Sequence, residues 1–228
     1  MTKRTKQSVL WKVIHPNNPN QVSYLLGTIH IQSQFAFKRL ATYKKLIATC
    51  DAYAAESDLD KLSQLELEGQ FDESYAAEYQ AVLSGNQYQH LDRFVRREIP
   101  QIYHMWQVLH PLLLMSQIES ALMGSDEEQS LDLTIWEFAK AAGKKMFAIE
   151  PALMQQDIFK EIELDTAFRN IKSAISNFPK LSMKYKKLAR YYQTDDIHAL
   201  YLNAKKQLGK MKHKMLYDRN VFMADRIE

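Results

Sequence analysis

The chain has 228 residues, of which 46% are hydrophobic and 11% aromatic, as in ordinary globular proteins. Its formal net charge of +3 is close to balanced and demands no polyanionic partner. The single cysteine, Cys50, excludes an intramolecular disulfide and any Cys-x-x-Cys metal or redox motif. This length suits one domain, and we expect a single domain over residues 1–228 with a helical lobe at about 60–130.

The sequence contains no membrane or secretion signal. No segment approaches the ~20 apolar residues that a transmembrane helix needs. The first eight residues are basic, but only Val9, Leu10 and Trp11 follow before Lys12, whereas a secretory signal has roughly 7–15 apolar residues there. As written, the chain therefore fits a cytoplasmic protein. A chain from which a leader has been removed looks the same, so a periplasmic or other extracytoplasmic location stays open.

Two apolar segments near the start predict a β-hairpin. Residues 9–14 and 22–31 have strand-like patterns, and residues 15–20 between them are rich in Pro and Asn. Apolar residues at spacings of three and four then predict an amphipathic helix over 37–50, which leads into a short strand over 52–56. This strand–helix–strand order is typical of units that form parallel strand pairs.

The rest of the chain is predicted to be mostly helical. Residues 60–130 include a long helix over 102–123, with Pro111 inside it or at a helix boundary. A helix over 132–142 ends at Gly143 and precedes a strand over 146–149, and helical patterns fill the chain after Pro151. We therefore expect an α/β fold that leans towards α+β, with a small mixed central sheet of about four strands surrounded by many helices.

The predicted strands end in side chains that can bind a metal ion or transfer a proton. One strand ends at His30, another at Glu56 with Asp58 two residues on, and a third at Glu150. An open α/β sheet places its chemistry outside such strand ends. Neutral imidazole binds Zn²⁺, Mn²⁺ or Co²⁺, and two close carboxylates favour a metal ion or an arginine between them. The pattern therefore indicates a binding or catalytic site along one edge of the sheet.

These residues also have simpler interpretations. His30 could be hydrogen-bonded to the backbone at a strand end, and Glu56 could begin a solvated loop. Glu150 could line the same edge or cap the helix after Pro151. Arg219 and Asn220 could orient a carboxylate or a substrate carbonyl through forked donation, or could lie on a helix surface.

Residues 180–214 form a basic stretch, with nine lysines and one arginine against Asp195 and Asp196. Such a stretch can contact nucleic acid or anionic lipid. More often it is a solvated helical face, and no nucleic-acid-binding fold accompanies it here. We therefore expect no nucleic-acid partner.

Several short motifs, taken in order and spacing, make the chain resemble the TraB/PrgY/GumN family, which is related to the TIKI metalloproteases. The resemblance runs nearly end to end. It is carried by Leu10-Trp11-Lys12-Val13, Leu26-Gly27-Thr28-Ile29-His30, Ala55-Glu56-Ser57-Asp58, Leu131-Asp132 before Ala139-Lys140-Ala141-Ala142-Gly143-Lys144, Ile149-Glu150 before Gln155-Gln156, Tyr191-Tyr192-Gln193-Thr194-Asp195-Asp196, and Tyr217-Asp218-Arg219-Asn220-Val221-Phe222-Met223-Ala224.

The resemblance implies an erythromycin-esterase/ChaN-like fold and a divalent-metal-dependent hydrolase that is peptidase-like. The family's proposed site has two Gly-x-x-His motifs and a glutamate, of which the first motif matches Gly27–His30 and the glutamate matches Glu56. It implies a metal ion, Mn²⁺, Co²⁺ or Zn²⁺, held by His30, Glu56 and Asp58, with a peptide or small-molecule substrate. Arg219, Asn220 and Glu150 are then expected near the substrate.

One motif of the family is not found. The second Gly-x-x-His is expected on a strand after the Arg-Asn helix, whereas the sequence ends at Glu228, and Gly209 is followed by His213 one residue too late. We therefore expect this chain to lack that C-terminal strand. Catalytic zinc sites usually have three protein ligands, so metal binding is expected to be weak or absent here unless a further C-terminal segment supplies another histidine. The alternative is a non-catalytic protein that keeps the fold and binds a peptide signal, as in pheromone shutdown.

Overall fold

The computed structural model describes residues 7–29, 34–61, 71–123, 127–151, 163–208 and 212–227. The chain divides into two compact units, which we describe separately. The first unit consists of Met1–Leu59, Asp126–Pro151 and Lys187–Glu228, and the second of Asp60–Ser125 and Ala152–Lys186.

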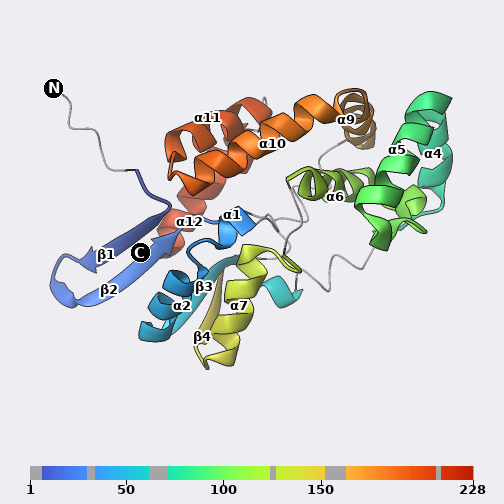
Figure 1. The fold of residues 1–228 in the computed structure, drawn as a ribbon. Helices are drawn as coiled ribbons and strands as arrows, with labels where there is room; N and C mark the ends of the chain where they lie inside the picture. The colour runs from blue at the N-terminus through green and yellow to red at the C-terminus, as the bar shows by residue number, and fades with distance from the viewer. Residues whose placement is uncertain are drawn as a thin grey trace, which may run out of the picture. The chain divides into compact units, whose positions relative to one another are not determined.

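A β-hairpin opens the first unit, as the sequence predicts (Figure 1). Strand β1 (Leu10–His15) pairs antiparallel with β2 (Asn18–Leu26), and Leu10 lies opposite Leu26. The Gly27 backbone N–H donates to the Val9 carbonyl at 2.8 Å, which extends the pairing by one step beyond β2. The hairpin thus fixes the start of the Gly27-Thr28 segment that precedes His30, while His30 itself lies outside the described residues.

A second sheet of the first unit is the parallel pair of β3 (Ala52–Ser57) and β4 (Lys145–Glu150). Helices α2 (Leu40–Thr49) and α7 (Leu131–Ala141) pack beside these strands (Figure 1), and the Tyr53 ring meets the Trp136 ring edge-on at 6.2 Å. Gly143, at φ +68°, ends α7 in the left-handed conformation that a glycine adopts readily and turns the chain into β4. The adjacent parallel strands therefore finish at the same edge.

The expected class, a helix-rich mixed α/β fold with few strands, is confirmed. Within the described residues the four strands form two sheets of two strands each. The strand–helix–strand segment over 22–56 does not give a β2–β3 pair there, because β2 pairs with β1 and β3 pairs with β4. Local pattern indicates a strand, but the partner of a strand depends on contacts far along the chain.

The C-terminal part of the first unit is helical. It contains the end of α10 (Phe178–Gln193), α11 (Ile197–Leu208) and α12 (Arg219–Ile227), whereas the short helix α1 (Gln34–Phe37) lies between β2 and α2. A π-helical segment, η4 (His213–Asp218), leads directly into α12, so residues 212–227 are helical throughout. Helix α12 packs against β4. None of the helices in the described ranges is both long and apolar enough to cross a membrane.

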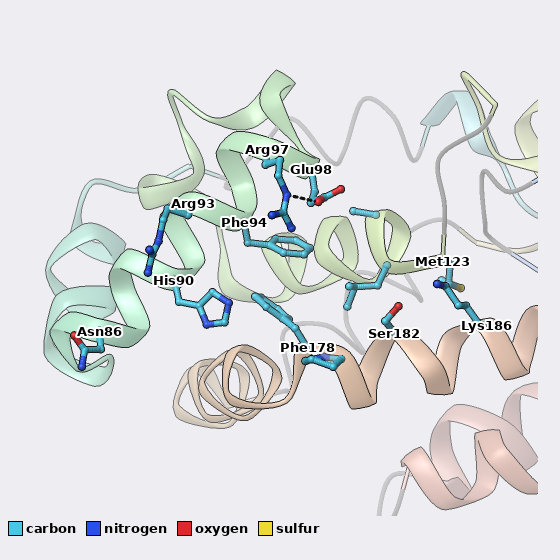
Figure 2. Close-up of a pocket in the computed structure, with 13 residues that line it drawn as sticks. Asn86, His90, Arg93, Phe94, Arg97, Glu98, Met123, Phe178, Ser182 and Lys186 are labelled. Carbon is cyan, nitrogen blue, oxygen red and sulfur yellow. Dashed lines mark hydrogen bonds and ion pairs between the residues drawn. The ribbon is translucent and has the colours of Figure 1, made fainter.

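The second unit is mainly helical in its described residues. It contains α4 (Ser74–Val82), α5 (Gly85–Glu98), η1 (Pro100–Ile102), η2 (Trp106–Val108), α6 (Pro111–Met123), α9 (Leu164–Ser176) and the first part of α10. Ser84 and Gln87 form a capping box at the start of α5. Helices α5, α6 and α10 border a hollow (Figure 2). The helix expected over 102–123 begins only at Pro111, because proline lacks the N–H that a helix interior needs but fits the first helical position.

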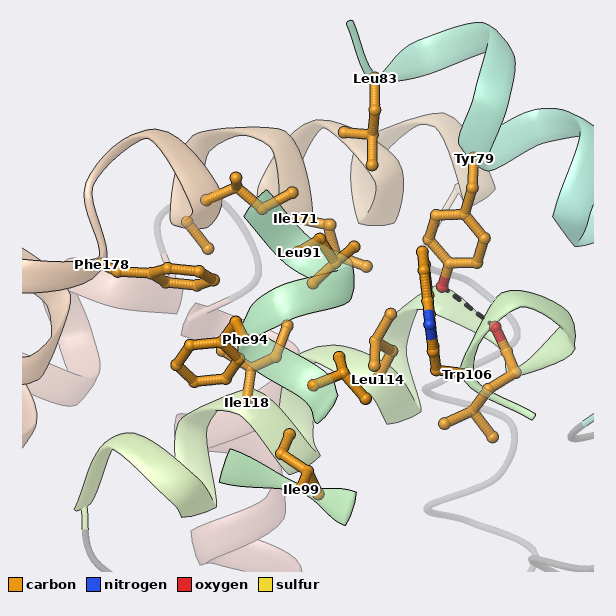
Figure 3. Close-up of a cluster of buried hydrophobic side chains, with 14 of the residues drawn as sticks. Tyr79, Leu83, Leu91, Phe94, Ile99, Trp106, Leu114, Ile118, Ile171 and Phe178 are labelled. Atoms are coloured by element: carbon orange, nitrogen blue, oxygen red, sulfur yellow. Dashed lines mark hydrogen bonds between the residues drawn. The ribbon is translucent and has the colours of Figure 1, made fainter. Parts of the chain in front are cut away.

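The core of this unit is a cluster of aromatic and branched apolar side chains (Figure 3). Tyr79 belongs to this cluster and lies edge-on to Trp106 at 5.5 Å and to Phe168 at 4.8 Å, measured between ring centroids. The Tyr79 hydroxyl, which is buried, donates to the Leu109 carbonyl at 3.0 Å. The one polar atom of that ring therefore has a partner within the apolar core.

Candidate functional site

The candidate site lies at the edge where β3 and β4 end. The two strands run parallel, and Ser57 is opposite Glu150 in the register. Glu56 precedes Ser57, so both strand-end glutamates belong to one edge of one sheet. This juxtaposition is what the sequence predicted from two apolar segments that each end in an acid.

Arg219, the first residue of α12, joins the two glutamates. Its Nε donates to Glu150 Oε1 at 2.9 Å and its Nη2 donates to Glu150 Oε2 at 2.5 Å, a bidentate pair. The same Nη2 also donates to Glu56 Oε1. We call Glu56, Glu150 and Arg219 the acid–arginine cluster. Of the two roles considered for Arg219, orientation of a carboxylate is the one observed in its contacts.

Burial differs sharply within the acid–arginine cluster. The Glu150 side chain is fully buried, that of Arg219 is 17% exposed, and that of Glu56 is 38% exposed. A buried carboxylate is costly without a partner, and the bidentate guanidinium supplies one. Glu56 is thus the carboxylate of the cluster that solvent reaches.

The acid–arginine cluster stabilises the positive charge of Arg219. The hydrogen bond to Glu150 is the main cause that raises the pKa of Arg219 above its ordinary value, and burial opposes it. The guanidinium therefore stays charged at any ordinary pH.

The other predicted site residues lie as follows. Asp58 directly follows β3 and is half-buried, and Asn220 is exposed on α12 beside Arg219. His30 lies outside the described residues, so its separation from Glu56 is not described. The structure therefore brings together three of the predicted residues, Glu56, Glu150 and Arg219.

A tyrosine that sequence reasoning did not select fixes the segment before His30. The Tyr192 hydroxyl donates to the Gly27 carbonyl at 3.1 Å and is also hydrogen-bonded to Tyr43. Burial raises the pKa of Tyr192, so the hydroxyl keeps its proton. The signal was present, because Tyr192 belongs to one of the motifs on which the family resemblance rests.

Gly27 is not required by close packing among the described residues. A Cβ at this position would lie 3.8 Å from the Val9 carbonyl oxygen, an ordinary van der Waals distance. The described neighbours of Gly27 therefore leave room for a methyl group.

The sequence analysis also did not predict an ion pair between Arg39 and Asp195, near the start of the hairpin. Arg39 donates to Asp195 through Nη1 at 2.9 Å and through Nη2 at 2.6 Å, and Asp195 also accepts from the Val9 N–H at 3.1 Å. Asp195 has φ +58°, a left-handed conformation that aspartate tolerates better than most residues. The contact ties the start of β1 to α2 and to the turn after α10.

The described residues fit part of a metal site. Glu56, with its partly exposed carboxylate, is a suitable oxygen donor, whereas both oxygens of Glu150 accept hydrogen bonds from Arg219. Among the described ranges no three His, Cys, Asp or Glu residues are grouped closely enough to hold a metal ion. His30, the expected imidazole ligand, is outside those ranges. Of the expected ligands, the structure therefore describes only the carboxylates Glu56 and Asp58.

The fold and the site define a helix-rich α/β protein with an arginine-bridged acid pair at the edge of a parallel sheet. The model of the TraB/PrgY/gumN family matches residues 9–228. Because this match covers nearly the whole chain, the protein belongs to the TraB/PrgY/gumN family. Comparison with the curated proteins and with the solved structures gave no significant match.

Proposed function

We propose that the protein is a divalent-metal-dependent hydrolase of the TraB/GumN type that acts on a peptide or a similar carbonyl compound. The observation that carries the proposal is the pair of strand-end carboxylates at one sheet edge, of which Glu56 is 38% exposed. Membership of the TraB/PrgY/gumN family supports it, since the sequence resemblance implies that Glu56 is the glutamate of the family's proposed site. The ChaN-like arrangement and the kinship with TIKI metalloproteases belong to the same proposal.

In this proposal the residues have distinct tasks. His30, Glu56 and Asp58 would hold the ion, most suitably Mn²⁺, Co²⁺ or Zn²⁺, and such an ion would supply a water activated as a nucleophile near neutral pH. Glu56 would also accept a proton from the attacking water and return it to the leaving group. Water is added across the scissile bond, so no other reactant is needed.

Arg219 and Glu150 are positioning residues in this account. The bidentate bond to buried Glu150 fixes the guanidinium plane, and the third bond from Nη2 then fixes the Glu56 carboxylate. Holding one oxygen of Glu56 in place reduces the entropy lost when the group reaches its productive geometry. Asn220, exposed next to Arg219, is the neighbouring donor available to a substrate carbonyl.

Peptide hydrolysis by the full-length protein tests this function. Cleavage of a peptide library is measured with and without added Mn²⁺, Co²⁺ or Zn²⁺, for the natural protein and for His30→Ala and Glu56→Gln. We expect metal-stimulated cleavage that falls by about 100-fold or more in each variant, because loss of a general base or ligand costs that much. Glu137→Gln, the same charge change at an exposed position of α7, is the matched control and should keep full activity.

A second candidate function is a non-catalytic peptide-binding protein. It is favoured by the hydrogen bonds of Glu150, because both of its carboxylate oxygens accept from Arg219 and are therefore already occupied. Binding of a peptide without cleavage, unchanged by metal and by Glu56→Gln, would support this alternative and contradict the hydrolase.

A further inference from the structure

The second unit contains a large hollow that the proposed hydrolytic site does not use. It has a volume of about 980 Å³ and lies between α5, the end of α6 and the start of α10 (Figure 2). Pockets that hold small molecules measure roughly 300–1,000 Å³, so this hollow is large enough for a ligand. We call it the α5–α10 hollow.

The floor of the α5–α10 hollow is apolar. The Phe94 and Phe178 rings stack at 4.3 Å with 29° between their planes, and both side chains are nearly buried. Leu122 and Met123, at the end of α6, line the same space and are half-buried. The His90 ring meets Phe178 edge-on at 5.2 Å (Figure 2). An apolar tail placed here would remove its own surface and the exposed parts of Leu122 and Met123 from water, which stabilises binding by about 25 cal/mol per Å² buried.

The rim of the α5–α10 hollow is basic. Arg93 and Arg97 lie four residues apart and hence on one face of α5, and Lys186 lines the hollow from α10. Glu98 is the one carboxylate among the described lining residues, and it accepts from Arg97 Nε at 2.6 Å. Three cations against one carboxylate leave an excess of two positive charges beside an apolar floor. All of these residues are in the second unit.

We propose that the α5–α10 hollow binds a small amphiphile with a carboxylate head and a long apolar tail, such as a free fatty acid. The guanidinium groups of Arg93 and Arg97 suit a carboxylate, because their fork matches its two oxygens. The stacked rings and the half-buried Leu122 and Met123 suit an unbranched chain.

Calorimetric titration of the full-length protein tests the head and the tail separately. The probes are dodecanoate below its micelle concentration, dodecyltrimethylammonium with the same tail and the opposite charge, and acetate with the head alone. We expect saturable binding of dodecanoate at one site per chain, weakened by added salt, and at least tenfold weaker binding of both other probes. Equal affinity for the two twelve-carbon probes would overturn the proposal, because the basic side chains at the rim would then not distinguish a negative head group from a positive one.

Substitutions locate the binding. Ser182 lines the hollow and is half-buried, so Ser182→Trp should fill the space and abolish dodecanoate binding. Arg93→Gln with Arg97→Gln should weaken binding about tenfold while the cavity stays open. Arg96→Gln, which removes one positive charge from α5 outside the hollow, should leave the affinity unchanged. Circular dichroism checks that each variant is folded. Unchanged affinity in folded Ser182→Trp and in the double variant would overturn the proposal.

Discussion

At the scale of single residues, the acid–arginine cluster is the main finding. A fully buried Glu150 persists because Arg219 donates two hydrogen bonds to it, and the same guanidinium reaches Glu56. The sequence indicated all three residues, but only as separate candidates. Glu150 and Arg219 are 69 positions apart, and no local pattern specifies which carboxylate an arginine will meet.

Removing the arginine should destabilise the protein strongly. Arg219→Met leaves Glu150 buried without its counter-ion, and breaking such a buried pair costs about 3–5 kcal/mol of unfolding free energy. Urea unfolding followed by circular dichroism measures the loss. Arg226→Met, an exposed position of the same helix that stacks its guanidinium on Phe222, should cost under about 1 kcal/mol. Equal losses in the two variants would contradict the account of the acid–arginine cluster.

The Arg39–Asp195 pair should make stability depend on pH in acid. The hydrogen bond from Arg39 is the largest cause that lowers the pKa of Asp195 below its ordinary value. A carboxylate with a depressed folded pKa contributes stability above its unfolded pKa, near 3.9, and loses it as the pH falls through the folded value. The unfolding free-energy difference between the natural protein and Asp195→Asn should thus be constant above about pH 5 and shrink below pH 4.

Asparagine is the suitable replacement at this position, because it tolerates the left-handed φ of +58° that Asp195 adopts. Repeating the comparison in an Arg39→Gln background is the control. The pH-dependent part of the difference should be smaller there, since the main cause of the lowered pKa is removed. A difference that does not change between pH 5 and pH 2 would contradict this prediction.

At the scale of elements, the strands and most helices could be predicted from local pattern. The strand expected over 52–56 is observed as Ala52–Ser57, and that over 146–149 as Lys145–Glu150. Local pattern left two features undecided. Pro111 was expected inside a helix or at a helix boundary, and it is observed at the boundary where α6 begins. The pairing of β3 with β4 depends on long-range contacts. The pairing of β3 with β4 brings the two strand-end glutamates to one edge. The sequence showed that each strand ends in an acid, but it did not specify that these two strands are neighbours.

The turn between α7 and β4 should tolerate only glycine well. Gly143 has φ +68°, so Gly143→Ala forces a Cβ into the left-handed region and should cost about 1 kcal/mol. Gly85, at the start of α5, has no positive φ, and a methyl group added there would meet open space. Gly85→Ala should therefore be neutral or slightly stabilising, by up to about 1 kcal/mol. Thermal unfolding of both variants checks the contrast, and equal effects would contradict it.

At the scale of the whole molecule, the two compact units carry different chemistry. The first holds the acid–arginine cluster and the Gly27-Thr28 segment that Tyr192 fixes. The second holds an aromatic core and the basic α5–α10 hollow. Composition predicted neither the acid–arginine cluster nor the basic hollow, because a net charge of +3 does not show how the charged residues are distributed in the structure. The proposed hydrolysis and the proposed amphiphile binding therefore stand or fall independently.

The central claim is that Glu56, held by Arg219, takes part in binding a catalytic ion at the edge of β3 and β4. Anomalous X-ray scattering from crystals of the full-length protein grown with Mn²⁺ tests it most directly. We predict a manganese peak in coordinating contact with the Glu56 carboxylate and the His30 imidazole, lost in Glu56→Gln. Manganese bound elsewhere, with none at this edge, would contradict the claim.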